Sequence, residues 1–222
     1  MLNSTNILLL ITAYIFGSVP TAVWIGKIFY GIDVREYGSG NAGATNTFRV
    51  LGRKAGIPVL VFDVFKGFAA VMLANFSHYQ SGSVQFINLQ LVLGVASLLG
   101  HIFPLFAAFR GGKGIATLLG IGIAVHPQAA SLSIVVFLAV FLLSRYVSLG
   151  SMVAAVMFPV NIICIFKSTV PSLVIFSLVI AILVLLTHQK NIERLMKRQE
   201  SRVSFRRKPG TADQETEDDD ED

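Results

Sequence analysis

Long apolar stretches alternate with short polar segments along most of the chain. A transmembrane helix needs roughly 20 apolar residues, and five of the seven stretches are convincing spans by this measure. The other two are short and meet at His126-Pro127, so they form either two helices or one long helix interrupted by proline. The seven stretches are Ile7 to Phe29, Ile57 to Phe76, Phe86 to Ala108, Ile115 to Val125, Ala129 to Leu143, Leu149 to Phe166 and Val170 to Thr187. The pattern predicts an all-α, polytopic integral membrane protein.

The composition supports this prediction. Of the 222 residues, 54% are hydrophobic and only 14% are charged, and the mean hydropathy is +0.68. Soluble globular domains carry about 25% charged residues. The single cysteine, Cys164, excludes an intramolecular disulfide and any metal site built from cysteines.

The positions of the basic residues favour seven helices over six. With seven, sixteen of the eighteen Lys and Arg residues fall on one face of the membrane. With six, the basic C-terminal tail would have to cross the membrane, which the positive-inside rule disfavours. We therefore expect seven transmembrane helices, with the N-terminus outside and the C-terminus in the cytoplasm. The first stretch has no basic n-region and no A-x-A cleavage site, so we interpret it as a retained helix and not a signal peptide.

Two charged residues lie inside the second apolar stretch. Asp63 and Lys66 are three positions apart in "VFDVFKGFAA", so on a helix they share a face and can pair within the bundle. Ionisable groups at membrane depth usually persist by pairing. A structural role is therefore favoured over a functional one.

The first polar loop, "GSGNAGATNTFR", contains a G-x-G-x-x-G at Gly38, Gly40 and Gly43. A dinucleotide-binding fingerprint needs a preceding strand, and an apolar helix precedes this loop, so that reading fails. Glycines also let a backbone approach an anion closely, and Arg49 is suited to bidentate binding. The neutral side chains beside them are Ser39, Asn41, Thr45 and Asn46. The loop is either an anion site or only a solvated connection.

A second glycine-rich loop favours the anion site. In "FRGGKGIATLLG", Arg110 and Lys113 lie among glycines just before a helix that we expect to begin at Ile115. Free N–H groups and the positive end of the helix dipole make such a position suitable for phosphate. It is not a Walker A loop, because Gly114 follows Lys113 where Ser or Thr is required.

The two remaining predicted cytoplasmic segments are also polar. "SRYVSLGS" places Ser148 and Ser151 one helical turn apart, and "THQKNIERL" does the same for His188 and Asn191. The loops expected on the opposite side carry almost no charge. All four cytoplasmic segments thus offer polar or cationic groups near the membrane surface.

These segments, with "GHIFPLFAAFRGGKGIAT" and an early "GSVP", resemble the bacterial membrane glycerol-3-phosphate acyltransferases that use acyl phosphate, the PlsY family. The resemblance runs from about Ile7 to Leu195. It implies a seven-helix enzyme of the bacterial cytoplasmic (inner) membrane whose active site faces the cytoplasm. It also implies acyl transfer from acyl phosphate to the 1-hydroxyl of sn-glycerol 3-phosphate, which gives lysophosphatidic acid and inorganic phosphate in the first step of phospholipid synthesis.

The resemblance also implies the site. The substrate-binding positions that match the family's motifs are Ser39, Asn41, Arg49, Lys113, Ser151, His188 and Asn191. Lys113, His188 and His101 are the catalytic candidates. Ser151 is favoured over Ser148 as the serine that faces the substrate. The implied partners are acyl phosphate, glycerol 3-phosphate and membrane lipid, and we expect a monomer that binds no nucleic acid.

The chemistry agrees with these residue types. An acyl phosphate is already activated, so the reaction needs orientation and charge stabilisation more than an enzyme nucleophile. The histidines, with a reference pKa near ~6.5, are candidate bases, and alternatively a substrate phosphate oxygen takes the proton. Before Ile192 the chain has only three carboxylates, which are scattered at Asp33, Glu36 and Asp63. We therefore expect no metal and no cofactor.

The main alternative is a transporter or channel for organic phosphates. Such a protein should carry ionisable residues near the midplane of several spans, whereas here only Asp63 and Lys66 qualify.

We expect three regions: a seven-helix catalytic domain over 1–193, a basic juxtamembrane segment over 194–210 and an acidic, disordered tail over 211–222. From Arg194 to Lys208 there are seven cations against Glu200 alone, so this segment either lies on anionic headgroups or only reflects the positive-inside rule. From Asp213 to Asp222 eight of ten residues are acidic, and such a run repels itself.

Overall fold

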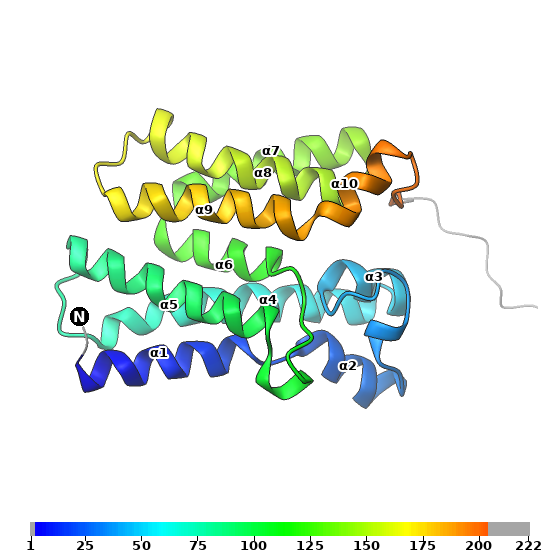
Figure 1. Ribbon diagram of the computed structural model, residues 1–222, viewed down its shortest axis with the longest axis horizontal. Helices are drawn as coiled ribbons and strands as arrows, with labels where there is room; N and C mark the ends of the chain where they lie inside the picture. The colour runs from blue at the N-terminus through cyan, green and yellow to red at the C-terminus, as the bar shows by residue number, and fades with distance from the viewer. Residues whose placement is uncertain (1–2, 204–222) are drawn as a thin grey trace, which may run out of the picture.

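The computed structural model describes residues 3–203, and within this range it contains helices and no strand (Figure 1). The α-helices are α1 (Ser4–Gly17), α2 (Thr21–Tyr30), α3 (Ala44–Leu51), α4 (Arg53–Met72), α5 (Val84–Ile102), α6 (Ile115–Val125), α7 (Pro127–Ser144), α8 (Val147–Val160), α9 (Pro171–Thr187) and α10 (Gln189–Met196). Short 3₁₀ turns are η1 (Val34–Glu36), η2 (Leu73–Phe76) and η3 (Leu105–Ala107), and a π-turn, η4 (Asn161–Ile165), continues α8. The tail expected over 211–222 lies outside the described residues.

Four helical segments within residues 3–203 are long and apolar enough to cross a membrane. They are Arg53–Phe76, Val84–Ala107, Pro127–Ser144 and Val147–Ile165. Two bent pairs, α1 with α2 and α9 with α10, raise the number to six if each pair is one span. α6 is apolar but only 11 residues long. The expectation of an all-helical membrane protein is confirmed, and the number of spans stays a prediction.

The first apolar stretch is not one continuous helix. α1 and α2 meet at an angle of 41° across Ser18, Val19 and Pro20. Proline lacks an N–H and disfavours a helical conformation in the residue before it, so "GSVP" ends α1 and starts α2. The apolar pattern alone could not reveal this break because both sides of it are equally apolar.

The uncertainty at His126-Pro127 resolves as two helices. Pro127 is the first residue of α7, where its missing N–H has no helical partner to lose. The Nδ1 atom of His126 accepts a hydrogen bond from the backbone N–H of Ala129 at 3.3 Å. His126 therefore caps α7 and separates it from α6.

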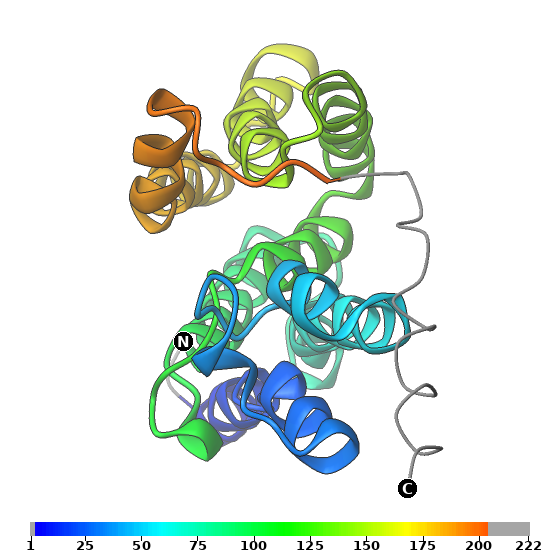
Figure 2. The ribbon, with the colours of Figure 1, turned by 90° about the vertical axis from the view of Figure 1, so that its right-hand side faces the viewer.

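The helices form two groups. α1, α4, α5 and α6 lie in one, and α7, α8 and α9 lie in the other, as the views in Figures 1 and 2 agree. α4 and α6 pack closely because Gly67 and Gly120 lie at their contact, where a Cβ on either would overlap a backbone carbonyl of the other helix. This packing fixes the start of α6, and hence Lys113 just before it.

The predicted cytoplasmic segments gather at one end of the bundle. We call this the polar end and define it as residues 31–52, 103–114, 144–151 and 188–203 (Figure 2). The start of α1 lies at the opposite end (Figure 1). The polar end therefore collects side chains that are far apart in the sequence.

Candidate functional site

The first glycine loop is held by Asn46. Its Oδ1 atom accepts hydrogen bonds from the backbone N–H of Ser39 at 2.8 Å and from the Ser39 hydroxyl at 3.1 Å. Its amide nitrogen donates to the carbonyls of Val34 at 2.8 Å and Tyr37 at 3.1 Å. Asn46 is buried, so it organises the loop and is not exposed to a ligand. Sequence reasoning had placed it among the donors that could meet an anion.

Asn41 and Arg49 differ from Asn46 in this respect. Asn41 is half-buried in the loop, and Arg49 lies exposed in the last turn of α3. Neither side chain is hydrogen-bonded to another described residue. Both are positioned at the polar end with donors that are open to an incoming group.

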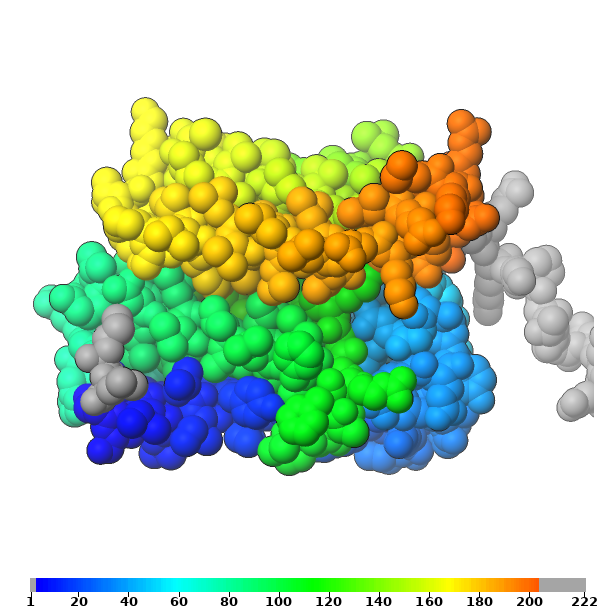
Figure 3. Space-filling model, in the orientation of Figure 1, coloured from blue at the N-terminus to red at the C-terminus, as the bar shows by residue number. Residues whose placement is uncertain are grey.

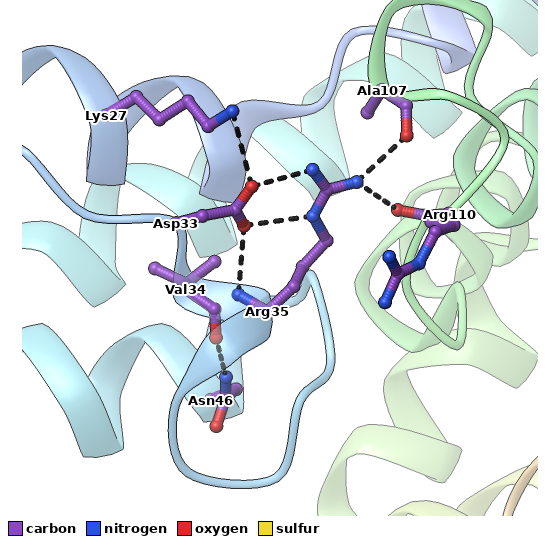
Figure 4. Close-up of polar contacts among 7 residues, drawn as sticks. All are labelled: Lys27, Asp33, Val34, Arg35, Asn46, Ala107 and Arg110. Atoms are coloured by element: carbon purple, nitrogen blue, oxygen red, sulfur yellow. Dashed lines mark hydrogen bonds and ion pairs between the residues drawn. The ribbon is translucent and has the colours of Figure 1, made fainter.

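Arg35 ties the first loop to the second (Figure 4). Its Nη1 atom donates to the carbonyls of Ala107 at 2.9 Å and Arg110 at 3.2 Å. Its Nε and Nη2 atoms donate to the two carboxylate oxygens of Asp33 at 2.9 and 2.7 Å. This guanidinium, with the Lys27 ammonium 3.3 Å from Oδ2, holds the pKa of the Asp33 carboxyl well below its usual range. In the sequence, Arg35 is simply one of the sixteen basic residues expected on one face of the membrane.

Lys113 is the cation at the end of the second glycine loop. Its Nζ atom donates to the Oδ1 atom of Asn191, which joins the second loop to α10. Burial, together with the neighbouring charges of Arg194 and Arg49, lowers the pKa of Lys113 to about 8, although the charge of Glu200 opposes this shift. At neutral pH Lys113 therefore carries a charge that has few partners among the described residues.

Gly114 forms the backbone turn between Lys113 and the start of α6. It has a φ of +79° and immediately precedes the first residue of α6. A side chain is strained in that conformation, so glycine is required there. The helix begins at Ile115, as the sequence predicts.

His188 lies at the junction of α9 and α10, just beyond the apolar segment. Its side chain is buried, and its Nδ1–H donates to the carbonyl of Val184 at 2.8 Å. Because a carbonyl only accepts, Nδ1 carries the proton and Nε2 is left as an acceptor. Burial, with a smaller effect from the charge of Lys113, lowers the pKa of His188 to about 4. His188 is therefore neutral at physiological pH.

Glu200 is the main residue of the site that sequence reasoning missed. Its Oε1 atom accepts from the Ser148 hydroxyl at 2.8 Å and from the Asn191 amide at 2.7 Å. Its Oε2 atom accepts from Nε of Arg194 at 2.9 Å. Burial alone would raise the pKa of Glu200, but these hydrogen bonds and the charge of Arg194 hold it below its usual value. Glu200 thus joins α8 to α10 as an anion.

The chain folds back to bring Glu200 there. α10 ends at Met196, Arg198 has a φ of +56°, and the backbone N–H of Val203 donates to the Arg145 carbonyl at 3.0 Å. Nε of Arg202 also donates to the Tyr146 hydroxyl at 2.9 Å. Residues 199–203 therefore lie against the start of α8. The one signal in the sequence was a single acid within a basic run.

Ser148 and Ser151 have different environments. The hydroxyl of Ser148 joins the Glu200 cluster, whereas the hydroxyl of Ser151 donates to the Val147 carbonyl of its own helix at 2.9 Å. Both side chains are buried. The structure thus brings Ser148 together with Asn191 through Oε1 of Glu200, and Ser151 lies one turn further along α8.

His101 approaches the same loop from inside the bundle. It lies near the end of α5, and a Cβ on Gly112 would overlap its Nε2 atom. The backbone N–H of Gly112 donates to the His101 carbonyl at 3.2 Å. On its other side, Nδ1 of His101 is 3.7 Å from Oδ1 of Asp63, which pairs with Lys66 at 2.8 Å. The predicted pairing of Asp63 and Lys66 is confirmed.

The side chains that could bind a metal ion are dispersed over the described residues. Within residues 3–203 no three His, Cys, Asp or Glu side chains lie close enough together to hold a metal ion. The candidate site is built from cations, amides, hydroxyls and a neutral imidazole, with the Glu200 carboxylate bonded to Asn191 at its edge. Such a set binds a phosphate-bearing molecule through charge and hydrogen bonds.

Comparison with known proteins agrees with this chemistry. A family model described as glycerol-3-phosphate acyltransferase matches residues 7–198. A glycerol-3-phosphate acyltransferase from Pelodictyon phaeoclathratiforme is 39% identical over an alignment of 232 positions, which covers 92% of this chain and 99% of that protein. The corresponding protein from Enterococcus faecalis is 42% identical over 207 residues, which cover 90% of this chain and 92% of that protein.

Two solved structures are also similar. The glycerol 3-phosphate form of PlsY, an integral membrane glycerol 3-phosphate acyltransferase, is 37% identical with a TM-score of 0.82 and covers 90% of this chain and 96% of that chain. The lysophosphatidic acid form is 36% identical with a TM-score of 0.79 and the same coverage. With a family model matched along nearly its whole described length, the chain belongs to the glycerol-3-phosphate acyltransferase family.

Proposed function

We propose that this chain transfers an acyl group from acyl phosphate to the 1-hydroxyl of sn-glycerol 3-phosphate. The products are lysophosphatidic acid and inorganic phosphate. Membership of the glycerol-3-phosphate acyltransferase family supports the activity and the acceptor. A similar solved protein was determined in glycerol 3-phosphate and lysophosphatidic acid forms. The observation that carries the proposal is Lys113, a charged and partly buried ammonium beside Asn191 at the polar end.

The proposed phosphate site has cations at its centre and neutral donors around it. Lys113 and Arg49 supply positive charge, and Arg49 can bind two phosphate oxygens at once. The electrostatic effect of Arg49 on the pKa of Lys113 supports their proximity. The neutral side chains proposed to complete the site are Ser39, Asn41, Ser151, His188 and Asn191. Ser148, which contacts Glu200, is proposed to hold Asn191 and not the substrate.

The chemistry needs no covalent enzyme intermediate. The acceptor hydroxyl attacks the acyl carbon, the bond from that carbon to the phosphate oxygen breaks, and inorganic phosphate leaves. Lys113 and the loop N–H groups stabilise the negative charge that grows on the departing phosphate. Holding both reactants in one site removes much of the entropic barrier.

The hydroxyl proton is proposed to pass to a phosphate oxygen of the substrate. His188 is neutral with its proton on Nδ1, so its Nε2 is available to accept a hydrogen bond, and its proposed role is to orient the acceptor. His101 lies against Gly112, and its proposed role is to position the loop that carries Lys113. This version is tested by replacing His188 and His101 separately with Ala. A fall of several orders of magnitude in kcat with unchanged KM in either variant contradicts it, because that result marks a proton-transfer residue.

An apolar groove supports a lipid-soluble donor. It has a volume of about 840 Å³ and lies between α1, α5 and α9, with Tyr14, Val95 and Val179 among its lining residues. Figure 3 shows the face of the bundle where α9 lies along α5. We propose that the acyl chain occupies this groove while the phosphate reaches the polar end.

The proposed topology follows from the same arrangement. We propose seven spans, with α6 as a short fourth span between longer neighbours, an external N-terminus and a cytoplasmic C-terminus. The basic residues of the polar end then face the cytoplasm of a bacterial inner membrane. The proposed enzyme acts as a monomer and needs no cofactor.

One assay tests the function. Purified protein in detergent is given glycerol 3-phosphate with palmitoyl phosphate, palmitoyl-CoA or palmitoyl-acyl-carrier protein, and lysophosphatidic acid and phosphate are measured. We expect product with palmitoyl phosphate alone. Product with another donor instead contradicts the choice of donor, and no product from any donor across pH values and detergents contradicts the activity.

A further inference from the structure

A buried polar cluster lies beneath the Lys113 loop. Asp63 and Lys66 are each only 1% exposed, and His101 is 6% exposed. Oδ1 of Asp63 is 2.8 Å from Nζ of Lys66, 3.4 Å from the Thr21 hydroxyl and 3.7 Å from Nδ1 of His101. The cluster therefore joins α2, α4 and α5 around one carboxylate oxygen.

Asp63 cannot touch the substrate. The space enclosed by Asp63, Lys66 and His101 has a volume of about 10 Å³, which is about the minimum for one water molecule. Neither a phosphate group nor a glycerol fits there. Any effect of Asp63 on acyl transfer must therefore pass through another residue.

His101 is the residue that connects the cluster to the site. Its Nδ1 atom faces Asp63 and has no hydrogen-bond partner among the described residues, while its Nε2 atom lies against Gly112. Gly112 immediately precedes Lys113, and a Cβ on Gly112 would also lie 2.9 Å from the Ala42 carbonyl of the first loop. The imidazole thus supports the point where the two glycine loops meet.

Lys66 explains why the carboxylate is stable at this depth. Its ammonium pairs with Asp63 and donates to the Val19 carbonyl at 3.0 Å, in the break between α1 and α2. A buried charge needs such a partner, because desolvation otherwise favours the neutral form. Lys66 therefore fixes both the charge and the position of Asp63.

We propose that Asp63 is a positioning residue for acyl transfer, which holds His101 against Gly112 and so sets the position of the Lys113 loop. At 3.7 Å from Nδ1 the carboxylate makes no hydrogen bond, but its negative charge favours the imidazole state with a proton on Nδ1 and so directs the ring toward it. This role rests on the proposed function, and it differs from a merely structural ion pair because it predicts an effect on substrate affinity that depends on His101.

The test is a double-mutant cycle between the ion pair and His101. The charges are removed together in Asp63→Asn/Lys66→Met, so that no unpaired charge is left, and this change is made with and without His101→Ala. Each change alone should raise the KM for glycerol 3-phosphate and lower kcat/KM by roughly 100-fold, a loss typical of a small misplacement of binding groups. Because both act through one imidazole, the triple variant should lose no more than His101→Ala alone.

Losses that multiply in the triple variant overturn the proposal, and so does an unchanged KM in either parent. Asp63→Glu keeps the charge opposite Lys66 and repeats the test if the neutral pair folds poorly: it should raise KM only when His101 is present. Asn161→Leu is the matched control, since Asn161 is buried and bonds Ala129 and Ser133 on α7, and its effect should be independent of His101→Ala. Absence of activity in the unaltered protein would instead contradict the proposed function.

Discussion

Two carboxylates, Asp63 and Glu200, lie in contrasting environments. Asp63 lies inside an apolar helix and pairs with Lys66 three residues away. Glu200 lies in a basic tail, and its partners Ser148 and Asn191 are 52 and nine residues away in sequence. The first is stabilised by a neighbour on its own helix, and the second becomes an anchor only when the chain folds back.

This difference shows which contacts can be inferred from residues that are close in sequence. A charge in an apolar segment must find a partner, and on a helix the candidates are three or four positions away. A charge in a polar segment is satisfied by water, so nothing in its surroundings demands a partner. The comparison therefore predicts that Asp63 matters more for stability and that Glu200 matters mainly for the geometry of the site.

Replacing Asp63 alone is expected to have the largest effect. Asp63→Asn leaves the Lys66 ammonium buried without its carboxylate, which should lower the free energy of unfolding by about 3–5 kcal/mol. Thermal unfolding in detergent measures this. The double variant Asp63→Asn/Lys66→Met should recover most of the loss, and equal stability of the single and double variants would contradict the account.

Replacing Glu200 should have a smaller effect. Glu200→Gln keeps the shape but weakens the charge-assisted bond to Arg194, which is partly exposed, so we expect a loss of about 2 kcal/mol together with a higher KM for glycerol 3-phosphate. Glu193→Gln is the matched control, because Glu193 is exposed on α10 and pairs only with Lys197 among the described residues. If both variants behave alike, the Glu200 cluster does not support the site.

Arg35 sharpens the comparison because it connects the two glycine loops without a hydrogen bond to Asp63 or Glu200. Arg35→Lys keeps the charge but cannot maintain the planar fork between Asp33 and the carbonyls of the second loop. We expect a loss of about 1.5 kcal/mol in the free energy of unfolding. Arg53→Lys, at an exposed position of α4, should leave the unfolding midpoint unchanged, and a similar shift in both variants would exclude a specific brace.

The pH dependence of substrate binding should reveal the state of Lys113. Its pKa is lowered to about 8, so the ammonium is charged below that pH and becomes neutral above it. Above about pH 8 the KM for glycerol 3-phosphate should rise by about tenfold per pH unit. Lys113→Arg stays charged and should remove this rise, even if its KM at neutral pH is higher. A rise that persists in the arginine variant would assign it to another group.

The sequence predicted the parts of this structure that depend on local pattern. The apolar helices, the start of α6 at Ile115 and the pairing of Asp63 with Lys66 all follow from periodicity and spacing. The break at Pro20 could not be located by apolar content, since α1 and α2 are both apolar.

The candidate site could be predicted only in outline. Glycines and cations indicated an anion-binding surface, and the resemblance implied which side chains contribute to it. The internal role of Asn46 and the brace of Arg35 depend on how loops fold against each other. Glu200 depends on a reversal of the chain after α10, for which the sequence offers no strong turn signal.

The central claim is that the polar end binds the phosphate of glycerol 3-phosphate through Lys113. Calorimetric titration of the purified protein with glycerol 3-phosphate and with glycerol tests it most directly, using Lys113→Met and, as the matched control, Lys54→Met at an exposed position of α4. We expect the unaltered protein and the Lys54 variant to bind glycerol 3-phosphate and not glycerol, and the Lys113 variant to lose that binding. Equal binding of glycerol 3-phosphate by the Lys113 variant would contradict the claim.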